Sequence, residues 1–408
     1  MAVNWEHLWS DSAKSLVASD IRDAFKLTER ENVISFAGGL PSPDTFPRQE
    51  IWELCQELVF ELGDLSFQYG PTEGYTDLRE LIAAQMTQEG IPARRENILI
   101  TSGSQQGLDL ICKLLLNPGD GIIVELPGYV GGLGVIYGYQ GKTLGIPLDD
   151  EGLRVDILEE NLIRWKRQGV LPKLAYIVPN FQNPSGVTLS LERREKLLAL
   201  AEEYGFIIME DNPYGELRFS GESLPHMKSM PGGDHVIYLG SFSKVLMPGM
   251  RLAWICADET FINKLAVAKQ SADLCSGSFG QKLISQWLQS GKASDHVQML
   301  REMYQVRRDA MLQAMEKYFP AGVSWTQPQG GFFVWVTLPE SMNAKELLPY
   351  AVEAGVGYVP GEGFHVDGRG QNTIRLAYSQ ASPAQIEEGI KRLGKVLDGH
   401  MERISCAG

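Results

Sequence analysis

Short runs made almost wholly of apolar residues recur along the chain, and segments with helical patterns separate them. Runs this apolar are typical of strands buried on both faces, as in a mainly parallel sheet with helices on each side. We therefore predict an α/β fold. The predicted strands are residues 97–101, 121–126, 173–178, 206–210, 236–240 and 252–256, and the predicted helices include 105–116, 191–204 and 292–318.

The 408 residues are too many for one ordinary domain, and the pattern of elements changes near residue 290. We expect a large α/β domain over residues 48–290 and a smaller α+β domain over 291–408, which contains an aromatic-rich strand near 330–336. Residues 1–47 hold one predicted helix (20–28) and cannot form a core alone. We expect them to form an arm that packs on the small domain and the substrate site.

The charge balance excludes several classes of protein. Lys and Arg number 37 against 51 Asp and Glu, a net charge of −14, whereas a general nucleic-acid binder needs a basic surface. Apolar stretches of about 20 residues, the length that spans a bilayer, are absent from the sequence, and so is a secretory signal pattern. The five scattered cysteines favour a reducing cytoplasm, and the six histidines lack metal-ligand spacing.

Polar residues follow several of the predicted strands, where open parallel sheets bind their ligands. Ser104 and Gln105 open a helix after Gly103, and a helix N-terminus suits a phosphate, although a simple Ser cap explains the same pattern. Ser241, Ser243, Lys244 and Arg251 follow another strand. This set suits an anion, and a lysine in cationic or desolvating surroundings can form a Schiff base; the alternative is a surface lysine.

Two further strand ends carry an acid, a phenol and an amide. Asp211 and Tyr214 follow the strand at 206–210, and Asn183 lies in a proline-rich loop after the strand at 173–178. Each fits ordinary turn chemistry taken alone. Together with the lysine and the residues suited to a phosphate, they make up the set that pyridoxal 5′-phosphate uses. In that set the acid pairs with the protonated pyridine nitrogen.

The chain resembles a known family over nearly its whole length. It is similar to fold-type-I, pyridoxal-phosphate-dependent aminotransferases of class I/II, and is closest to the branch of 2-aminoadipate (LysN-like) and kynurenine aminotransferase II-like enzymes. That resemblance implies a mainly parallel sheet of the seven-stranded type, a smaller α+β domain and a homodimer with shared active sites. The motifs that carry it are FAGGLPSP (36–43), PNFQNPSG (179–186), EDNPY (210–214), GSFSKVLMPGMR (240–251) and NTIRLAYS (372–379).

The resemblance implies a role for each candidate residue toward the cofactor. Lys244 would bind the cofactor as a Schiff base and move a proton, and Asp211 would keep the pyridine nitrogen protonated. Tyr214 and Asn183 would bind the ring oxygen, and Tyr129 would stack on the ring. The residues implied for the phosphate are Ser104, Gln105, Ser241, Ser243 and Arg251, with Tyr69 from the other subunit.

The resemblance also implies how the substrate is held. Arg375, with Asn183, would bind the α-carboxylate, and the alternative is an arginine exposed on a strand. Gly39 would let the backbone approach the substrate. Arg22, in the predicted helix at 20–28, would meet the distal carboxylate of 2-aminoadipate or glutamate; an ordinary solvated arginine at a helix start is the alternative.

The implied activity is transfer of the amino group of 2-aminoadipate, an aromatic or a branched-chain amino acid to 2-oxoglutarate by a ping-pong mechanism. The same cofactor and fold also support β-lyases and decarboxylases. A non-catalytic, effector-sensing module is disfavoured, because the first ~45 residues are too few and too acidic for a DNA-binding domain. Two positions depart from the family pattern: Asn212, where an acid or alanine is common, and Gly128, where Ser or Thr is frequent.

Overall fold

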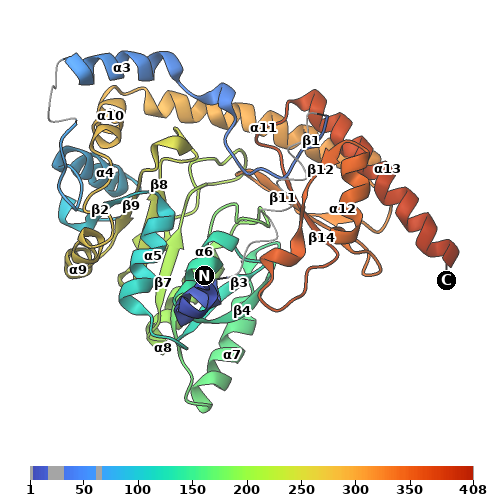
Figure 1. The fold of residues 1–408 in the computed structure, drawn as a ribbon, viewed down its shortest axis with the longest axis horizontal. Helices are drawn as coiled ribbons and strands as arrows, with labels where there is room; N and C mark the ends of the chain where they lie inside the picture. The colour runs from blue at the N-terminus through green and yellow to red at the C-terminus, as the bar shows by residue number, and fades with distance from the viewer. Residues whose placement is uncertain (1–2, 17–31, 61–66, 408) are drawn as a thin grey trace.

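The computed structural model describes residues 3–16, 32–60 and 67–407, with side chains up to residue 403 (Figure 1). Its largest sheet has eight strands, of which β8, β7, β6, β3 and β4 run parallel, while β9 is antiparallel to both its neighbours. The α/β fold with a mainly parallel sheet is thus confirmed. In spatial order the strands are β2 (Ile98–Thr101), β9 (Ala253–Cys256), β8 (Val236–Ser241), β7 (Ile207–Asp211), β6 (Pro172–Ile177), β3 (Gly121–Leu126), β4 (Lys142–Asp149) and β5 (Gly152–Leu153).

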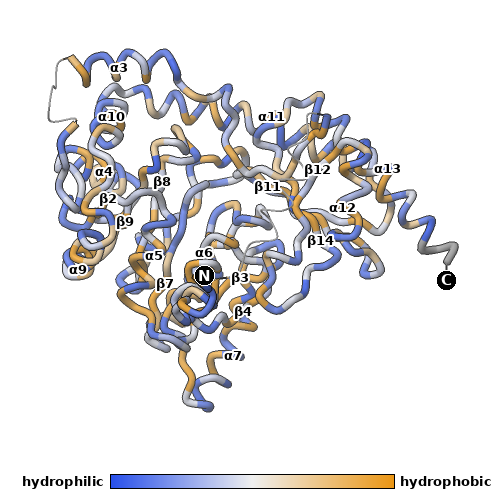
Figure 2. The backbone as a smooth tube through the Cα atoms, in the orientation of Figure 1, coloured by the Kyte–Doolittle hydropathy of each residue, from blue (hydrophilic) through white to orange (hydrophobic). Residues whose placement is uncertain are grey.

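Helices cover both faces of this sheet, which is why its inner strands are mostly apolar. In β6, Leu174 and Tyr176 face the cluster that contains α5, α6 and α9, whereas Ala175 and Ile177 face α7 and α8. Figure 2 shows the same contrast, with apolar strands inside and mixed helices outside. The helices of this part are α3 (Arg48–Phe60), α4 (Thr76–Gln88), α5 (Ser104–Leu115), α6 (Val130–Gly138), α7 (Val155–Arg167), α8 (Leu191–Tyr204), α9 (Glu259–Gln270) and α10 (Ser278–Gln289).

The sequence located six of the eight strands and missed β4 and β5. The missed strand β4 lies beside the short edge strand β5, and its burial alternates instead of being complete. Its composition is correspondingly mixed, with Gly145 and Pro147 inside the strand. The predicted helices at 105–116, 191–204 and 292–318 match α5, α8 and α11 to within a residue, while the one at 20–28 lies outside the described residues.

A second, antiparallel sheet forms its own core with two long helices and one short one. Its strands are β10 (Ser324–Trp325), β11 (Phe333–Thr337), β14 (Thr373–Ala377) and β13 (Val359–Pro360), and its helices are α11 (Ala293–Tyr318), α12 (Ala344–Glu353) and α13 (Pro383–Ala407). The helix α11 extends from beside α10 to α13 and so joins the two parts of the molecule (Figure 1). The domain boundary at residue 290 stays a prediction.

The N-terminal segment contacts both parts. Strand β1 (Ile34–Ser35) pairs in parallel with β12 (Val356–Gly357) beside the small sheet. The short helix α1 (Asp11–Ser15) lies on the end of α6, where Ser12 and Ser15 donate hydrogen bonds to backbone carbonyls. Residues between these two contacts lie outside the described ranges. Of the helices that the structure describes, none combines the length and the apolar character needed to cross a bilayer.

Candidate active site

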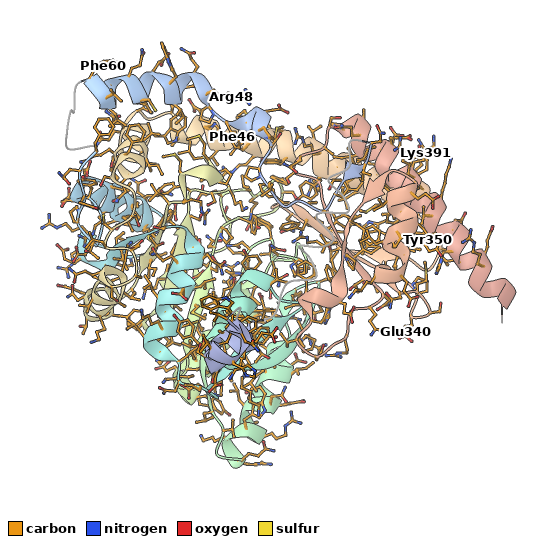
Figure 3. All side chains as sticks on the ribbon, viewed as in Figure 1. Phe46, Arg48, Phe60, Glu340, Tyr350 and Lys391 are labelled. Atoms are coloured by element: carbon orange, nitrogen blue, oxygen red, sulfur yellow. The ribbon has the colours of Figure 1, made fainter. Side chains whose placement is uncertain are left out.

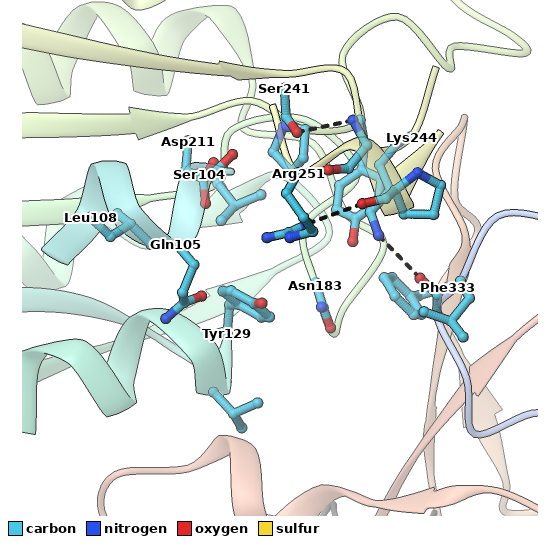
Figure 4. A pocket seen from close by; sticks show the side chains of 18 of the residues that line it. Ser104, Gln105, Leu108, Tyr129, Asn183, Asp211, Ser241, Lys244, Arg251 and Phe333 are labelled. Carbon is cyan, nitrogen blue, oxygen red and sulfur yellow. Dashed lines mark hydrogen bonds between the residues drawn. The ribbon is translucent and has the colours of Figure 1, made fainter. Parts of the chain in front are cut away.

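A cavity of about 380 Å³ lies where the carboxyl ends of the large sheet face strands β11 and β14. Every candidate residue from the sequence lines it except Tyr69 and Arg22 (Figure 4). Tyr69 is 77 % exposed and lies outside the cavity of its own chain, and Arg22 falls outside the described residues. The candidates in the lining are Gly39, Ser104, Gln105, Tyr129, Asn183, Asp211, Tyr214, Ser241, Ser243, Lys244, Arg251 and Arg375.

Lys244 lies on the loop that follows β8, and its ammonium group is held inside the cavity. Its Nζ donates a hydrogen bond to the carbonyl of Gly39 at 3.3 Å and lies 5.9 Å from the ring centre of Tyr214. Burial, followed by the nearby guanidinium groups of Arg251 and Arg375, lowers the pKa of Lys244 to about 8. A minor fraction of this amine is therefore unprotonated near neutral pH, far more than for an ordinary lysine, and this neutral form is the nucleophile.

Asp211 is the last residue of β7, and one of its two oxygens is uncommitted. Oδ2 accepts a hydrogen bond from the Tyr176 hydroxyl at 2.8 Å, while the buried Oδ1 has no partner among the described residues. Burial raises the pKa of Asp211 to about 6, against the opposing effects of Tyr176 and Lys244. An ionised, desolvated oxygen without a donor is suited to a cationic N–H group.

The N-terminus of α5 and the loop after β8 form an anion-binding cup. Gly103 caps the helix with φ of +84°, and a Cβ there would lie 2.3 Å from Nη2 of Arg251. The amide of Ser243 donates to Ser241 Oγ at 3.1 Å, which fixes these two hydroxyls together. Gln105 donates its side chain to the carbonyl of Gly131 at 2.7 Å, so it offers the cup its backbone amide. Helix amides, hydroxyls and a guanidinium suit a phosphate.

Arg375, in β14, is buried on the opposite side of the cavity. Its Nη1 donates to Asn183 Oδ1 at 2.9 Å and its Nη2 to the carbonyl of Ala37 at 2.7 Å, while Nε has no partner among the described residues. Burial lowers its pKa to about 10, so the group stays charged at neutral pH. A charged, oriented guanidinium with an unused N–H is suited to a carboxylate.

The comparisons with known proteins agree with this chemistry. The family model described as "Aminotransferase class I and II" matches residues 31–393. This chain belongs to the class I and II aminotransferases. Over 98 % of its length it is 46 % identical to the aromatic-amino-acid aminotransferase 1 of Thermococcus litoralis, of which it covers 96 %.

Two solved structures extend the comparison to the cofactor. The kynurenine aminotransferase of Pyrococcus horikoshii, in complex with PMP (pyridoxamine phosphate), is 45 % identical with a TM-score of 0.94; the match covers 97 % of this chain and 98 % of that one. The α-aminoadipate aminotransferase LysN of Thermus thermophilus, complexed with a phosphopyridoxyl-leucine, is 37 % identical with a TM-score of 0.90. That match covers 98 % of this chain and 100 % of the LysN chain. The aminotransferase is a pyridoxal-phosphate-dependent enzyme.

The cavity of the aminotransferase fits this cofactor. The unpartnered Oδ1 of Asp211 suits the protonated ring nitrogen, and the cup at α5 suits the phosphate. Tyr129 lines the cavity, and its ring packs against Gly131, where a Cβ would lie 2.5 Å from the phenol hydroxyl. In the described part of the chain, no group of three or more His, Cys, Asp or Glu side chains could hold a metal ion.

The two departures from the family pattern have structural reasons in the aminotransferase. The amide of Asn212 accepts a hydrogen bond from Asn180 at 2.8 Å and donates one to Tyr238 at 3.1 Å. A carboxylate could not donate, and alanine could do neither. At Gly128, a Cβ would lie 2.7 Å from the carbonyl of Glu125, so a larger residue would shift the backbone here.

Sequence reasoning missed one polar residue and the apolar lining. Tyr176 donates the hydrogen bond to Asp211. The sequence shows it as a tyrosine within a mostly apolar predicted strand, and a buried hydroxyl needs a hydrogen-bond partner, so this residue could have been found. The apolar lining had no signal, because such residues are indistinguishable from ordinary core. It consists of Leu40, Leu108, Val130, Val178, Pro213, Pro248 and Phe333. Gly39, expected to let the backbone approach the substrate, is also required by packing: a Cβ would lie 2.3 Å from Phe333 Cζ.

Proposed function

We propose that the aminotransferase moves the amino group of aromatic, branched-chain and 2-aminoadipate donors to 2-oxoglutarate in a ping-pong reaction. The observation that carries this is the pairing of buried Arg375 with an apolar wall of Leu40, Val130 and Phe333 in the cavity of Lys244. The arginine suits the α-carboxylate and the wall suits apolar side chains. Relatives named for aromatic amino acids and for α-aminoadipate support the same range.

We assign the chemistry to four residues around the cofactor ring. When bound, pyridoxal phosphate supplies an aldehyde that bonds to amines and a ring that withdraws electrons. Lys244 would bond to that aldehyde and, once released, take the proton from the substrate α-carbon. Asp211 would hold a proton on the ring nitrogen, Tyr214 and Asn183 would bind the ring oxygen, and Tyr129 would stack on the ring.

Orientation is assigned to the charged ends of the cavity. Ser104, Gln105, Ser241, Ser243 and Arg251 would hold the phosphate and so fix the ring. Arg375 would fix the α-carboxylate, which leaves the α-hydrogen facing Lys244. Among the described residues that line the cavity, Lys244, Arg251 and Arg375 are the cations, and all three have roles. A distal carboxylate would therefore depend on Arg22.

A donor screen on Arg22→Ala tests the substrate range. We expect kcat/KM for 2-aminoadipate to fall about a hundredfold, because a carboxylate loses its partner, while phenylalanine and leucine change less than about threefold. Half-reactions of single donors, followed by the absorbance of the cofactor, measure this without the acceptor. Lys14→Ala, an exposed cation of the same terminal segment, is the control. Equal losses for all donors would contradict the assignment of Arg22.

We also propose a homodimer in which Tyr69 reaches the phosphate of the partner's site. Two large apolar side chains near Tyr69 in the sequence stand exposed. Phe60, on α3 at one end of the molecule, is 81 % exposed (Figure 3), and Phe67 is 64 % exposed. Phe67 stacks on Phe279 of α10, with ring centres 6.1 Å apart. Apolar surface of this kind is typical of an interface.

Mixing two inactive variants tests the shared site. A chain with Tyr69→Ala retains its own Lys244, and a chain with Lys244→Ala supplies an intact Tyr69 to it. Random pairing makes about half of the dimers mixed, and each mixed dimer has one complete site out of two. About a quarter of the wild-type activity should therefore return. The control mixes Lys244→Ala with a chain carrying both substitutions, which has no complete site. If Tyr69 served its own chain, neither mixture would recover activity.

A further inference from the structure

An ion pair between a buried lysine and a partly exposed aspartate lies beside the turn that forms the anion-binding cup, and the chemistry assigned above does not use it. Lys269, near the end of α9, has a fully buried side chain and contacts both oxygens of Asp273 at 2.6 and 2.8 Å. Burying an ammonium group is costly, so the fold retains this pair against a free-energy penalty. Its neighbours indicate what it does.

Asp273 also accepts hydrogen bonds from both sides of the turn at Gly103. Ser102 Oγ donates to Asp273 Oδ2 at 3.0 Å, and Gln106 Nε2 donates to the same oxygen at 2.6 Å. The Oε1 atom of Gln106 in turn accepts from the Ser102 amide at 2.7 Å. A backbone amide can only donate, so the orientation of the Gln106 side chain is fixed. The result is a closed ring of hydrogen bonds around Gly103.

The charge of the pair matters as much as its geometry. A carboxylate is the best acceptor for two donors at once, but a lone negative charge next to a phosphate cup would weaken phosphate binding. Lys269 neutralises Asp273 at hydrogen-bond distance. The turn is thus held by a strong acceptor that adds no net charge.

We propose that Gln106 and the Lys269–Asp273 pair are positioning residues for the cofactor's phosphate. They fix the turn at residues 102–105, so that the first amides of α5, Ser104 and Arg251 converge on one point. None of the three needs to touch the phosphate itself. This inference rests on the proposed placement of the phosphate in the cup.

The test compares pyridoxal 5′-phosphate with pyridoxal, which has the same ring and aldehyde but no phosphate. Both are titrated into the full chain freed of cofactor, and the dissociation constants are taken from the absorbance that appears on bonding to Lys244. Gln106→Met keeps the side-chain length and removes both hydrogen bonds of the amide. We expect the dissociation constant of pyridoxal 5′-phosphate to rise about tenfold or more and that of pyridoxal to stay within about twofold.

A second variant removes the ion pair without leaving a buried charge. The double change Lys269→Met and Asp273→Leu replaces both charges by apolar side chains, so the buried position of Lys269 keeps no unpaired charge. It should raise the dissociation constant of pyridoxal 5′-phosphate at least as much as Gln106→Met does, and it should again leave that of pyridoxal within about twofold. The control is Gln298→Met, which removes a comparable glutamine–acid hydrogen bond, to Glu302, on the exposed face of α11.

The outcomes separate the two proposals. The positioning role is wrong if Gln106→Met and the double variant weaken the binding of both ligands equally, or weaken the binding of neither. Arg251→Ala removes a cation from the cup itself. If it leaves the affinity for pyridoxal 5′-phosphate unchanged, the proposed placement of the phosphate fails. If Arg251→Ala weakens binding but the other two variants do not, that placement stands and only the present inference fails.

Discussion

The two ends of the cavity are built in different ways. At the cofactor end, polar side chains follow β7 and β8 or begin α5, and hydrogen bonds fix them, as Tyr176 fixes Asp211. The other end is the one that we propose receives the side chain of the substrate, and we call it the side-chain end. Here Leu40, Val130 and Phe333 come from segments far apart in the chain and contribute apolar surface.

This difference would let one enzyme combine strict chemistry with the range of donors that we propose. Directional bonds between charged groups accept one ligand in one orientation. Apolar contacts discriminate weakly, because a methylene group more or less changes binding by only about 1–3 kcal/mol. Substitutions at the cofactor end should therefore affect all donors alike, whereas substitutions at the side-chain end should affect some donors more than others.

The largest effect is expected from Lys244→Ala. It removes the amine that we propose bonds to the cofactor and takes the α-proton, so transamination of every donor should fall by about 10⁴-fold or more. The visible absorbance of the bonded cofactor should vanish as well. Lys282→Ala is the matched control, since that lysine also lies over a tyrosine ring, at 4.1 Å, but outside the cavity. A normal spectrum in Lys244→Ala would remove Lys244 from its role.

Asp211→Ala comes second. Without the carboxylate, nothing in the described lining holds a proton on the ring nitrogen, and the rate with every donor should fall roughly 10³-fold. Tyr176→Phe, which removes a single hydrogen bond to Asp211, should cost about tenfold by the same route. Single-turnover rates with phenylalanine and 2-aminoadipate measure both. A loss confined to one donor would contradict the expectation that substitutions at the cofactor end affect all donors alike.

The cofactor end was also the more predictable end from sequence. Strands buried on both faces are mostly apolar, so β2, β7 and β8 and the polar residues at their ends could be located from the pattern alone. Ser104 and Lys244 follow such strands, and Asp211 ends one. The phosphate, amine and acid chemistry of these residues is specific enough to suggest one cofactor.

Contacts between distant segments could not be predicted from periodicity. The hydrogen bonds from Arg375 to the Ala37 carbonyl and to Asn183 join three segments, and only the family resemblance identified that arginine as a candidate. The packing of Phe333 against Gly39 likewise depends on how β11 approaches the N-terminal segment. The half-exposed strand β4 was missed because its composition is mixed.

Gly39→Ala tests the side-chain end with a moderate expected effect. The new Cβ would overlap Phe333, whose ring must move, and overpacking of this kind typically costs about 1–3 kcal/mol. We expect the ratio of kcat/KM between phenylalanine and leucine to change about tenfold. Gly134→Ala on α6, where a Cβ meets nothing within 4 Å, should leave that ratio unchanged. An equal loss for both donors would show that Gly39 acts at the cofactor end.

The smallest effect is a shift in pH dependence, measured as the rate at which the cofactor-free chain bonds to pyridoxal. Only the unprotonated amine reacts, so the rate should rise with pH and level off above the Lys244 pKa of about 8. The Asp211 carboxylate raises that pKa and the Arg251 guanidinium lowers it. Asp211→Asn should therefore move the midpoint to lower pH, and Arg251→Gln should move it to higher pH.

Pyridoxal is the right probe for this titration, because it has no phosphate through which Arg251→Gln could act. Below the Asp211 pKa of about 6, that carboxylate is protonated and no longer raises the pKa of Lys244, so the wild type and Asp211→Asn should converge there. Gly134→Ala on α6 changes no charge, and its Cβ meets nothing within 4 Å, so it should leave the midpoint in place. Shifts of the same sign in Asp211→Asn and Arg251→Gln would mean that general loosening of the site, and not these two charges, sets the acidity of the lysine.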